Sequence, residues 1–173
     1  MAWFSPTVYR RRITDIRPEE LRRRHIDGIL LDIDNTLTTH DSPALDPAVA
    51  DWLAQMQAAG VRLVIVSNNH PARVAPFADA LGLPYYADAG KPLPRGYREA
   101  VKVIGVPVER CAAVGDQIFT DILGANLAGM TSYLLEPIEP EVEQKFIVFK
   151  RRFERLLLRR RRAIRQKEAD YRE

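Results

Sequence analysis

Two aspartates stand one residue apart directly after an apolar run, in the segment Asp32-Ile33-Asp34. In extended chain, residues i and i+2 point to the same side, so Asp32 and Asp34 can share one site. Two close carboxylates repel each other and need a cation or a proton nearby. The pair therefore predicts a metal site or acid–base chemistry, although an aspartate before Asn35 is also ordinary turn chemistry.

Polar groups of matching chemistry follow three later apolar runs. Ser67-Asn68-Asn69 offers a hydroxyl and two amides, Lys91 follows in Ala-Gly-Lys-Pro, and Gly115-Asp116 precedes Asp121. Taken singly, each group has an ordinary explanation as a helix cap, a solvated lysine, a turn residue or a first-turn acid. Together, carboxylates suit Mg²⁺, a lysine and a hydroxyl suit phosphoryl oxygens, and an aspartate can move a proton. The set predicts phosphoryl transfer through an aspartyl-phosphate intermediate.

The elements that must position these groups alternate between short apolar runs and helical patterns. Strands are predicted at 28–33, 61–66, 84–87, 111–114 and 130–135, and helices at 46–60, 71–81, 94–104 and 120–128. This alternation predicts an α/β fold with a mostly parallel five-stranded sheet and helices on both faces. Ligands of such sheets bind beyond the carboxyl ends of the strands, which is where the polar groups stand.

In this order, the four groups resemble the four motifs of the haloacid-dehalogenase (HAD) superfamily. The segments DIDNTL, VSNN, AGKP and VGDQIFTDILGAN look like those of the YqeG-like phosphatases of HAD subclass IIIA, over roughly residues 1–140. The chain is similar, more distantly, to the mitochondrial phosphatidylglycerophosphate phosphatases. The resemblance implies a HAD-like Rossmannoid three-layer sandwich and a Mg²⁺-dependent phosphomonoester hydrolase.

The resemblance also implies a role for each motif residue. Asp32 would be the nucleophile and Asp34 the general acid and base, with Lys91 completing the catalytic set. The implied Mg²⁺ ligands are Asp32, the backbone carbonyl of Asp34, and Asp116. Asp121 would support either the metal shell or Lys91. The groups implied to bind the substrate phosphate are Thr36, Ser67, Asn68 and Lys91.

Spacing between the motifs bears on the size of the substrate. HAD enzymes carry cap domains after the first motif or between the second and the third. Only 32 residues separate Asp34 from Ser67 and 23 separate Ser67 from Lys91, and core elements occupy much of both gaps. No large cap domain fits, so an open site is expected, suited to a phospholipid, a phosphoprotein or a nucleic-acid end. Phosphatidylglycerophosphate is the best single substrate expectation.

The composition describes a folded chain with one cysteine. The 173 residues are 46% hydrophobic, which suits one globular domain with a real core. A single cysteine allows no internal disulfide and fits a reducing compartment. No apolar run approaches the ~18 residues of a membrane span, and the N-terminus has no signal-peptide core. The expected location is the cytoplasm, with peripheral contact at the inner membrane surface left open.

The C-terminal part of the chain is strongly basic. Residues 150–173 carry 11 Lys or Arg and 4 Asp or Glu, a balance of +7. An apolar stripe recurs there at helical spacing, formed by Val142, Phe146, Phe149, Phe153, Leu156 and Leu157. We expect a phosphatase core at 1–140 and a basic amphipathic helix at 141–173. That helix would pack on the core, lie on an anionic membrane surface, or contact another copy; the lack of an RNA-reading motif disfavours nucleic acid.

Two functions from other classes fit part of the pattern. A response-regulator receiver also combines acidic residues, a hydroxyl and a lysine on a parallel sheet. Its acceptor aspartate follows a middle strand and its lysine the last one, whereas here the Asp32 pair comes first and acids follow Lys91. The second alternative is a Mg²⁺-dependent binding or assembly factor with little turnover, which hydrolysis of a generic phosphate ester would exclude.

Overall fold

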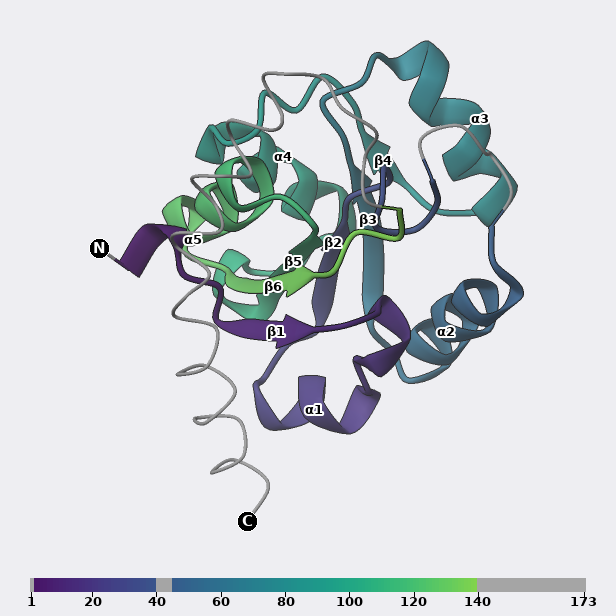
Figure 1. Ribbon diagram of the computed structural model, residues 1–173, viewed down its shortest axis with the longest axis horizontal. Helices are drawn as coiled ribbons and strands as arrows, with labels where there is room; N and C mark the ends of the chain where they lie inside the picture. The colour runs from purple at the N-terminus through teal and green to yellow at the C-terminus, as the bar shows by residue number, and fades with distance from the viewer. Residues whose placement is uncertain (1, 40–44, 140–173) are drawn as a thin grey trace.

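A computed structural model describes residues 2–39 and 45–139. Within them, six strands form one sheet in the order β1-β6-β5-β2-β3-β4, with every neighbouring pair parallel (Figure 1). The strands are β1 (Val8–Arg10), β2 (Gly28–Leu31), β3 (Arg62–Val66), β4 (Tyr85–Tyr86), β5 (Cys111–Gly115) and β6 (Thr131–Leu135). The predicted parallel α/β sheet is therefore confirmed, while the helix predicted at 141–173 lies outside the described residues.

The sheet has one strand more than the five predicted. The additional strand, β1, pairs with β6 at the edge of the sheet, where Val8 lies opposite Tyr133. It has only three residues and is followed by a run of arginines, so its sequence carries almost none of the apolar patterning typical of a strand.

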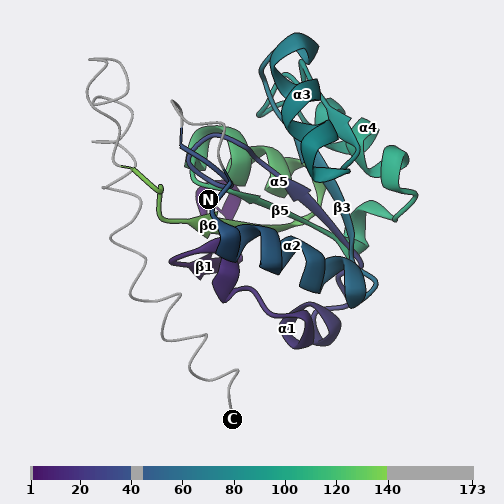
Figure 2. The same ribbon diagram turned by 90° about the vertical axis from the view of Figure 1, so that its right-hand side faces the viewer.

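Helices cover both faces of the sheet (Figures 1 and 2). They are α1 (Pro18–Arg23), α2 (Pro47–Ala58), α3 (Pro71–Leu81), α4 (Pro94–Ile104) and α5 (Leu123–Ala128). Short 3₁₀ turns occupy Ala2–Phe4, Ile13–Asp15 and Val108–Arg110, and a π-helical turn occupies Ile118–Ile122. Asp46 caps α2 as predicted, because its carboxylate accepts a hydrogen bond of 2.8 Å from the Ala48 amide.

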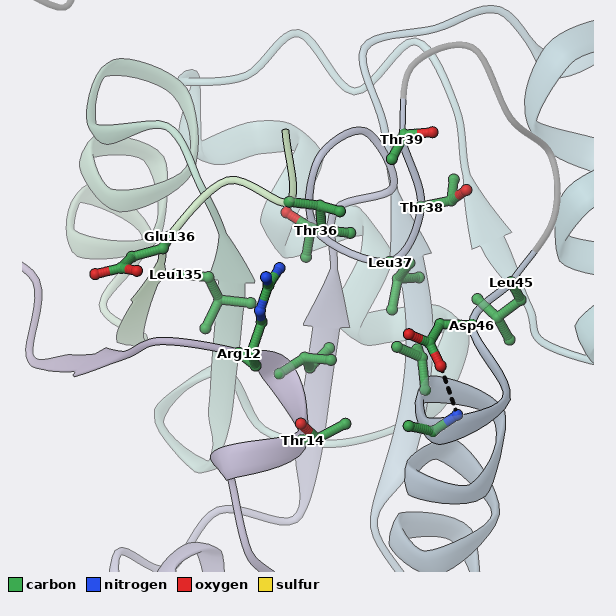
Figure 3. A pocket seen from close by; sticks show the side chains of 14 residues that line it. Arg12, Thr14, Thr36, Leu37, Thr38, Thr39, Leu45, Asp46, Leu135 and Glu136 are labelled. Carbon is green, nitrogen blue, oxygen red and sulfur yellow. Dashed lines mark hydrogen bonds between the residues drawn. The ribbon is translucent and has the colours of Figure 1, made fainter. Parts of the chain in front are cut away.

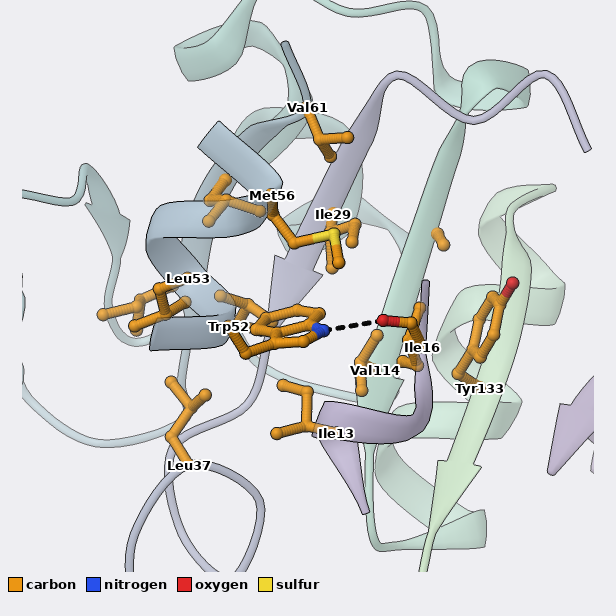
Figure 4. Packing of buried hydrophobic residues seen from close by; sticks show 14 of the residues in the cluster. Ile13, Ile16, Ile29, Leu37, Trp52, Leu53, Met56, Val61, Val114 and Tyr133 are labelled. Atoms are coloured by element: carbon orange, nitrogen blue, oxygen red, sulfur yellow. Dashed lines mark hydrogen bonds between the residues drawn. The ribbon is translucent and has the colours of Figure 1, made fainter. Parts of the chain in front are cut away.

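Residues of strand β2, in the middle of the sheet, alternate between two hydrophobic clusters. Ile29 and Leu31 pack in the cluster that includes Trp52 of α2, whereas Leu30 packs in the cluster that includes Tyr97 of α4. The Trp52 indole also donates a hydrogen bond of 2.8 Å to the Ile16 carbonyl, which ties α2 to the turn before α1 (Figure 4). Burial of the strand on both faces explains its continuous apolar sequence.

Two glycines allow α4 to pack closely, against the segment before Lys91 on one side and against α5 on the other. A Cβ on Gly96 would lie 2.0 Å from the Ala89 carbonyl oxygen, and one on Gly124 would lie 2.3 Å from the Tyr97 ring. The Tyr97 hydroxyl then donates a hydrogen bond of 2.9 Å to the Thr120 carbonyl. The contacts of Tyr97 hold α4 against α5 and against the π-helical turn that leads into it.

No large cap domain stands over the sheet in the part of the chain that the structure describes. Between β2 and β3 the only described helix is α2, and between β3 and Lys91 the chain forms only α3 and β4. No helix among the described residues is long and apolar enough to cross a membrane.

Candidate active site

The candidate residues gather at the carboxyl end of the sheet. Asp32 directly follows β2, Ser67 follows β3, and Asp116 follows β5. The three strands are neighbours in register, since Leu31 of β2 lies opposite Ile65 on one side and Val114 on the other. The ends of these strands therefore meet at the edge where the sequence predicts the site.

Lys91 bridges two of the predicted carboxylates. Its Nζ lies 2.5 Å from Oδ1 of Asp32 and 2.7 Å from Oδ1 of Asp121. The lysine side chain is 5% exposed, and those of Asp32 and Asp121 are 11% and 5% exposed. A charge as deeply buried as this requires close partners of opposite sign, and the two aspartates provide them.

The charges of this cluster change the proton affinity of its members. Burial raises the pKa of Asp32 to about 7, assisted by Asp121 and Asp34 and opposed by Lys91. Burial works to lower the pKa of Lys91, but Asp121 and Asp32 together raise it above its ordinary value. The two shifts are compatible because one lysine is shared by more than one carboxylate. Negative charge therefore remains in excess around Asp32.

A third aspartate makes this excess suitable for a metal ion. Carboxylate oxygens of Asp32, Asp116 and Asp121 all lie within 4.8 Å of one another. Converging carboxylates are the oxygen donors that hard divalent cations prefer. The acidic cluster predicted after β2 and β5 thus forms, and its donor set fits a cation.

Asp121 is held in place by the loop that precedes it. Its Oδ1 accepts from Lys91, and its Oδ2 accepts a hydrogen bond of 3.1 Å from the Gln117 amide. The sequence predicts a helix from Thr120, but the chain first forms the π-helical turn Ile118–Ile122. A Cβ on Gly115 would lie 2.3 Å from the Asp121 Cγ, so only glycine leaves room for this carboxylate.

The loop after β3 positions Lys91 through hydrogen bonds to the main chain of that lysine. The Asn68 side chain accepts a hydrogen bond of 2.6 Å from the Lys91 amide and donates one of 3.1 Å to the Lys91 carbonyl. Ser67 is buried, and its hydroxyl accepts a hydrogen bond of 3.1 Å from the Asn69 amide. The described contacts of Asn68 are therefore those of a group that positions Lys91.

Asp34 lies on the α3 side of the site. Its Oδ2 accepts a hydrogen bond of 2.8 Å from the Asn69 side chain, and its Oδ1 lies 3.0 Å from Nη2 of Arg73. Arg73 is absent from the residues predicted for the site. The one signal in the sequence is a cation in the first turn of a helix, where the dipole disfavours positive charge and a specific partner is needed.

Thr36 separates the carboxylates from a neighbouring hollow. Its hydroxyl lies 3.4 Å from Oδ2 of Asp32, and the preceding Asn35 has a positive φ of 59° that turns the chain sharply. Next to this loop lies a hollow of about 520 Å³, between the start of α2, the turn that contains Arg12 to Thr14, and the segment after β6 (Figure 3). Its wall includes Thr36 but neither Asp32 nor Lys91.

The sequence of this chain is similar to those of known hydrolases. The family model of the haloacid dehalogenase-like hydrolases matches residues 39–129, more than half of the chain. The chain belongs to this family. It is 36% identical over 157 residues to "Probable phosphatase YqeG" of Bacillus subtilis (strain 168), with 90% of each chain covered. The predicted resemblance is confirmed, and this HAD protein is a phosphatase, a phosphoric monoester hydrolase.

Other relatives share less of their length or sequence. The protein is 32% identical over 152 residues to "Phosphatidylglycerophosphate phosphatase 1, chloroplastic/mitochondrial" of Arabidopsis thaliana, a match that covers 82% of this chain and 43% of that one. Among solved structures, an HAD phosphatase from Thermococcus onnurineus aligns with a TM-score of 0.57 at 16% identity, covering 69% of this chain and 90% of that chain. Such a low identity shows the common fold alone.

Proposed function

We propose that this phosphatase hydrolyses phosphomonoesters in two steps, through an aspartyl phosphate on Asp32. The observation that carries the proposal is the buried bridge of Lys91 between Asp32 and Asp121, with Asp116 close by. A carboxylate nucleophile and a fixed cation that can bind phosphoryl oxygens are the parts that such a transfer needs.

In the first step, a carboxylate oxygen of Asp32 attacks phosphorus while the bond from phosphorus to the alcohol oxygen breaks. Asp34, held by Asn69 and Arg73, gives its proton to that departing oxygen. In the second step, Asp34 takes a proton from water, and the hydroxide attacks the aspartyl phosphate. Inorganic phosphate leaves, and the Asp32 carboxylate is restored.

The remaining residues bind and orient the transferred group. Lys91 and the Ser67 hydroxyl hold the phosphoryl oxygens, Thr36 stands beside Asp32, and Asn68 holds the main chain of Lys91. The carboxylates of Asp32 and Asp116, with the Asp34 carbonyl, would hold Mg²⁺. When bound, this ion supplies positive charge that lowers the repulsion between the carboxylates and the phosphoryl group.

A phospholipid headgroup such as phosphatidylglycerophosphate is the proposed substrate. Three features support it: the similarity to the Arabidopsis thaliana enzyme named for that activity, the absence of a large cap domain among the described residues, and the basic sequence of residues 150–173. That basic segment would bring the enzyme to an anionic membrane surface from the cytoplasmic side.

Purified protein with Mg²⁺ should be assayed against an aryl phosphate and a panel of phospholipid, nucleotide, sugar and protein phosphates. We expect turnover of the aryl phosphate that a chelator abolishes, and a preference for the phospholipid. The Asp32→Asn variant is the control, because it keeps the size of the side chain but removes the attacking charge. Binding of phosphorylated ligands with no turnover would reject the proposal in favour of a binding factor.

Deletion of residues 150–173 tests the membrane contact separately. The truncated protein should keep its activity on the soluble aryl phosphate and lose binding to anionic vesicles, since eleven basic residues are removed. Equal vesicle binding before and after the deletion would reject the membrane contact and leave the phosphatase proposal standing.

A further inference from the structure

Arg73 places a positive charge beside the aspartate proposed to transfer protons. It lies in the first turn of α3, and its Nη2 is 3.0 Å from Oδ1 of Asp34. The arginine side chain is 53% exposed, whereas that of Asp34 is 19% exposed. Because the amino end of a helix already carries partial positive charge, an arginine here does not serve the stability of α3.

Asp34 does not depend on Arg73 alone for its orientation. The other oxygen of Asp34 already accepts a hydrogen bond of 2.8 Å from Asn69, so this carboxylate has a second donor that orients it. A guanidinium presents five N–H donors in a planar fork suited to phosphate oxygens. With half of its side chain exposed, Arg73 can contact a ligand while it remains beside Asp34.

The position of Arg73 relative to the reaction follows from the proposed function, on which this inference rests. Asp34 must come within hydrogen-bond reach of the leaving alcohol oxygen to protonate it. Arg73 is one hydrogen bond farther along, so its guanidinium lies within about 6 Å of an alcohol oxygen that shares Oδ1 of Asp34, by two such lengths in series. A group attached to the leaving oxygen through a short alcohol can therefore reach the guanidinium.

We infer that Arg73 binds a second anionic group, a phosphate or phosphodiester, carried by the alcohol part of the substrate. The carboxylates of Asp32 and Asp34 repel a further negative charge, so an ester of this kind needs a cation at the mouth of the site. Arg73 provides this cation on the side where the alcohol leaves. The same chemistry occurs in a soluble bisphosphate and in a phospholipid with a phosphodiester next to its terminal phosphate.

The experiment compares glycerol 1,3-bisphosphate with glycerol 3-phosphate, which has the same alcohol without the second anion. Phosphatidylglycerophosphate in phosphatidylcholine vesicles is the lipid counterpart. Arg73→Ala should reduce the preference for the bisphosphate by about ten- to a hundredfold, mainly through KM, because a charge-assisted contact is lost. Arg73→Lys should keep part of the preference, and Arg98→Ala, an exposed arginine on α4, should keep all of it.

Each outcome separates this inference from the proposed function. An equal loss on the two glycerol phosphates would show that Arg73 acts only through Asp34, and would overturn the inference alone. A loss confined to the vesicle substrate would mean a contact with the membrane surface, and would overturn it as well. Turnover of none of the three esters by the unaltered enzyme, even with Mg²⁺, would overturn the proposed function and the inference with it.

Discussion

Replacing Lys91 by methionine tests whether the buried bridge organises the site. Methionine keeps most of the length of the side chain but removes the charge and its contacts of 2.5 Å and 2.7 Å with Asp32 and Asp121. The side chains of these two aspartates are only 11% and 5% exposed, so water cannot replace the lost partner. The substitution leaves like charges buried against each other.

The expected loss of stability is large for a single substitution. Removing one partner of a buried ion pair destabilises proteins by about 3–5 kcal/mol. At about 2–4 °C per kcal/mol for a chain of this size, the melting temperature should fall by roughly 6–20 °C. Mg²⁺ should recover part of this loss, because it supplies positive charge to the same carboxylates.

Thermal unfolding followed by circular dichroism, with a chelator and then with Mg²⁺, measures both effects. Lys102→Met is the matched control, since this lysine also pairs with a carboxylate at 2.8 Å but is 69% exposed. Its melting temperature should stay close to that of the unaltered protein. If Lys91→Met and Lys102→Met had the same melting temperature in chelator, the buried ion pairs of Lys91 would not stabilise the fold as the reasoning requires.

Four further predictions concern the acids and the space around them. Because the pKa of Asp32 is raised to about 7 in the folded protein, metal-free protein should lose stability as the pH rises from about 4 to 7; Asp32→Asn should remove this loss, and melting curves across pH would show it. The same variant should lose phosphatase activity by several orders of magnitude while it stays folded, in an aryl phosphate assay. Asp116→Ala should raise the Mg²⁺ concentration needed for half-maximal activity, or abolish turnover, and an unchanged Mg²⁺ titration would contradict its role as ligand. Asp34→Asn should slow phosphorylation by alkyl phosphates more than by activated aryl phosphates, and equal slowing would exclude proton donation.

The fold was predictable wherever apolar patterning was strong. The five predicted strands and the four predicted helices lie where expected, within a few residues, because buried runs and helix-capping residues mark them. Helix α1 and strand β1 were not predicted. Both are short, and β1 is held by pairing with a strand more than a hundred residues away, which no local pattern reveals.

The site was predictable as a set of residues but not as a set of contacts. Order along the chain indicates that Asp32, Lys91 and Asp121 share one edge of the sheet. It does not show that one lysine bridges both acids, which depends on how α4 packs against the turn before α5. Asn68 was expected to bind phosphate, yet its described contacts are with the main chain of Lys91. The role of Asn68 in binding phosphate remains a prediction.

The glycines show why a local rule can miss a functional constraint. Gly115 does not have a positive φ, so the conformational freedom of glycine does not explain why this position is a glycine. Its requirement comes from the Asp121 carboxylate, whose Cγ would lie 2.3 Å from an added Cβ. Only the fold brings these two residues together, and the sequence shows merely a glycine before an aspartate.

The excess of negative charge links the separate parts of the site. Lys91 stabilises two carboxylates, but burial still raises the pKa of Asp32 to about 7. A cation bound by Asp32 and Asp116 would favour the ionised form of Asp32, which is the form that would attack phosphorus in the proposed mechanism. Lys91 by itself therefore pairs with both acids but does not bring the pKa of Asp32 down to its ordinary value. The raised pKa of Asp32 is therefore a physical reason to expect the proposed dependence on Mg²⁺.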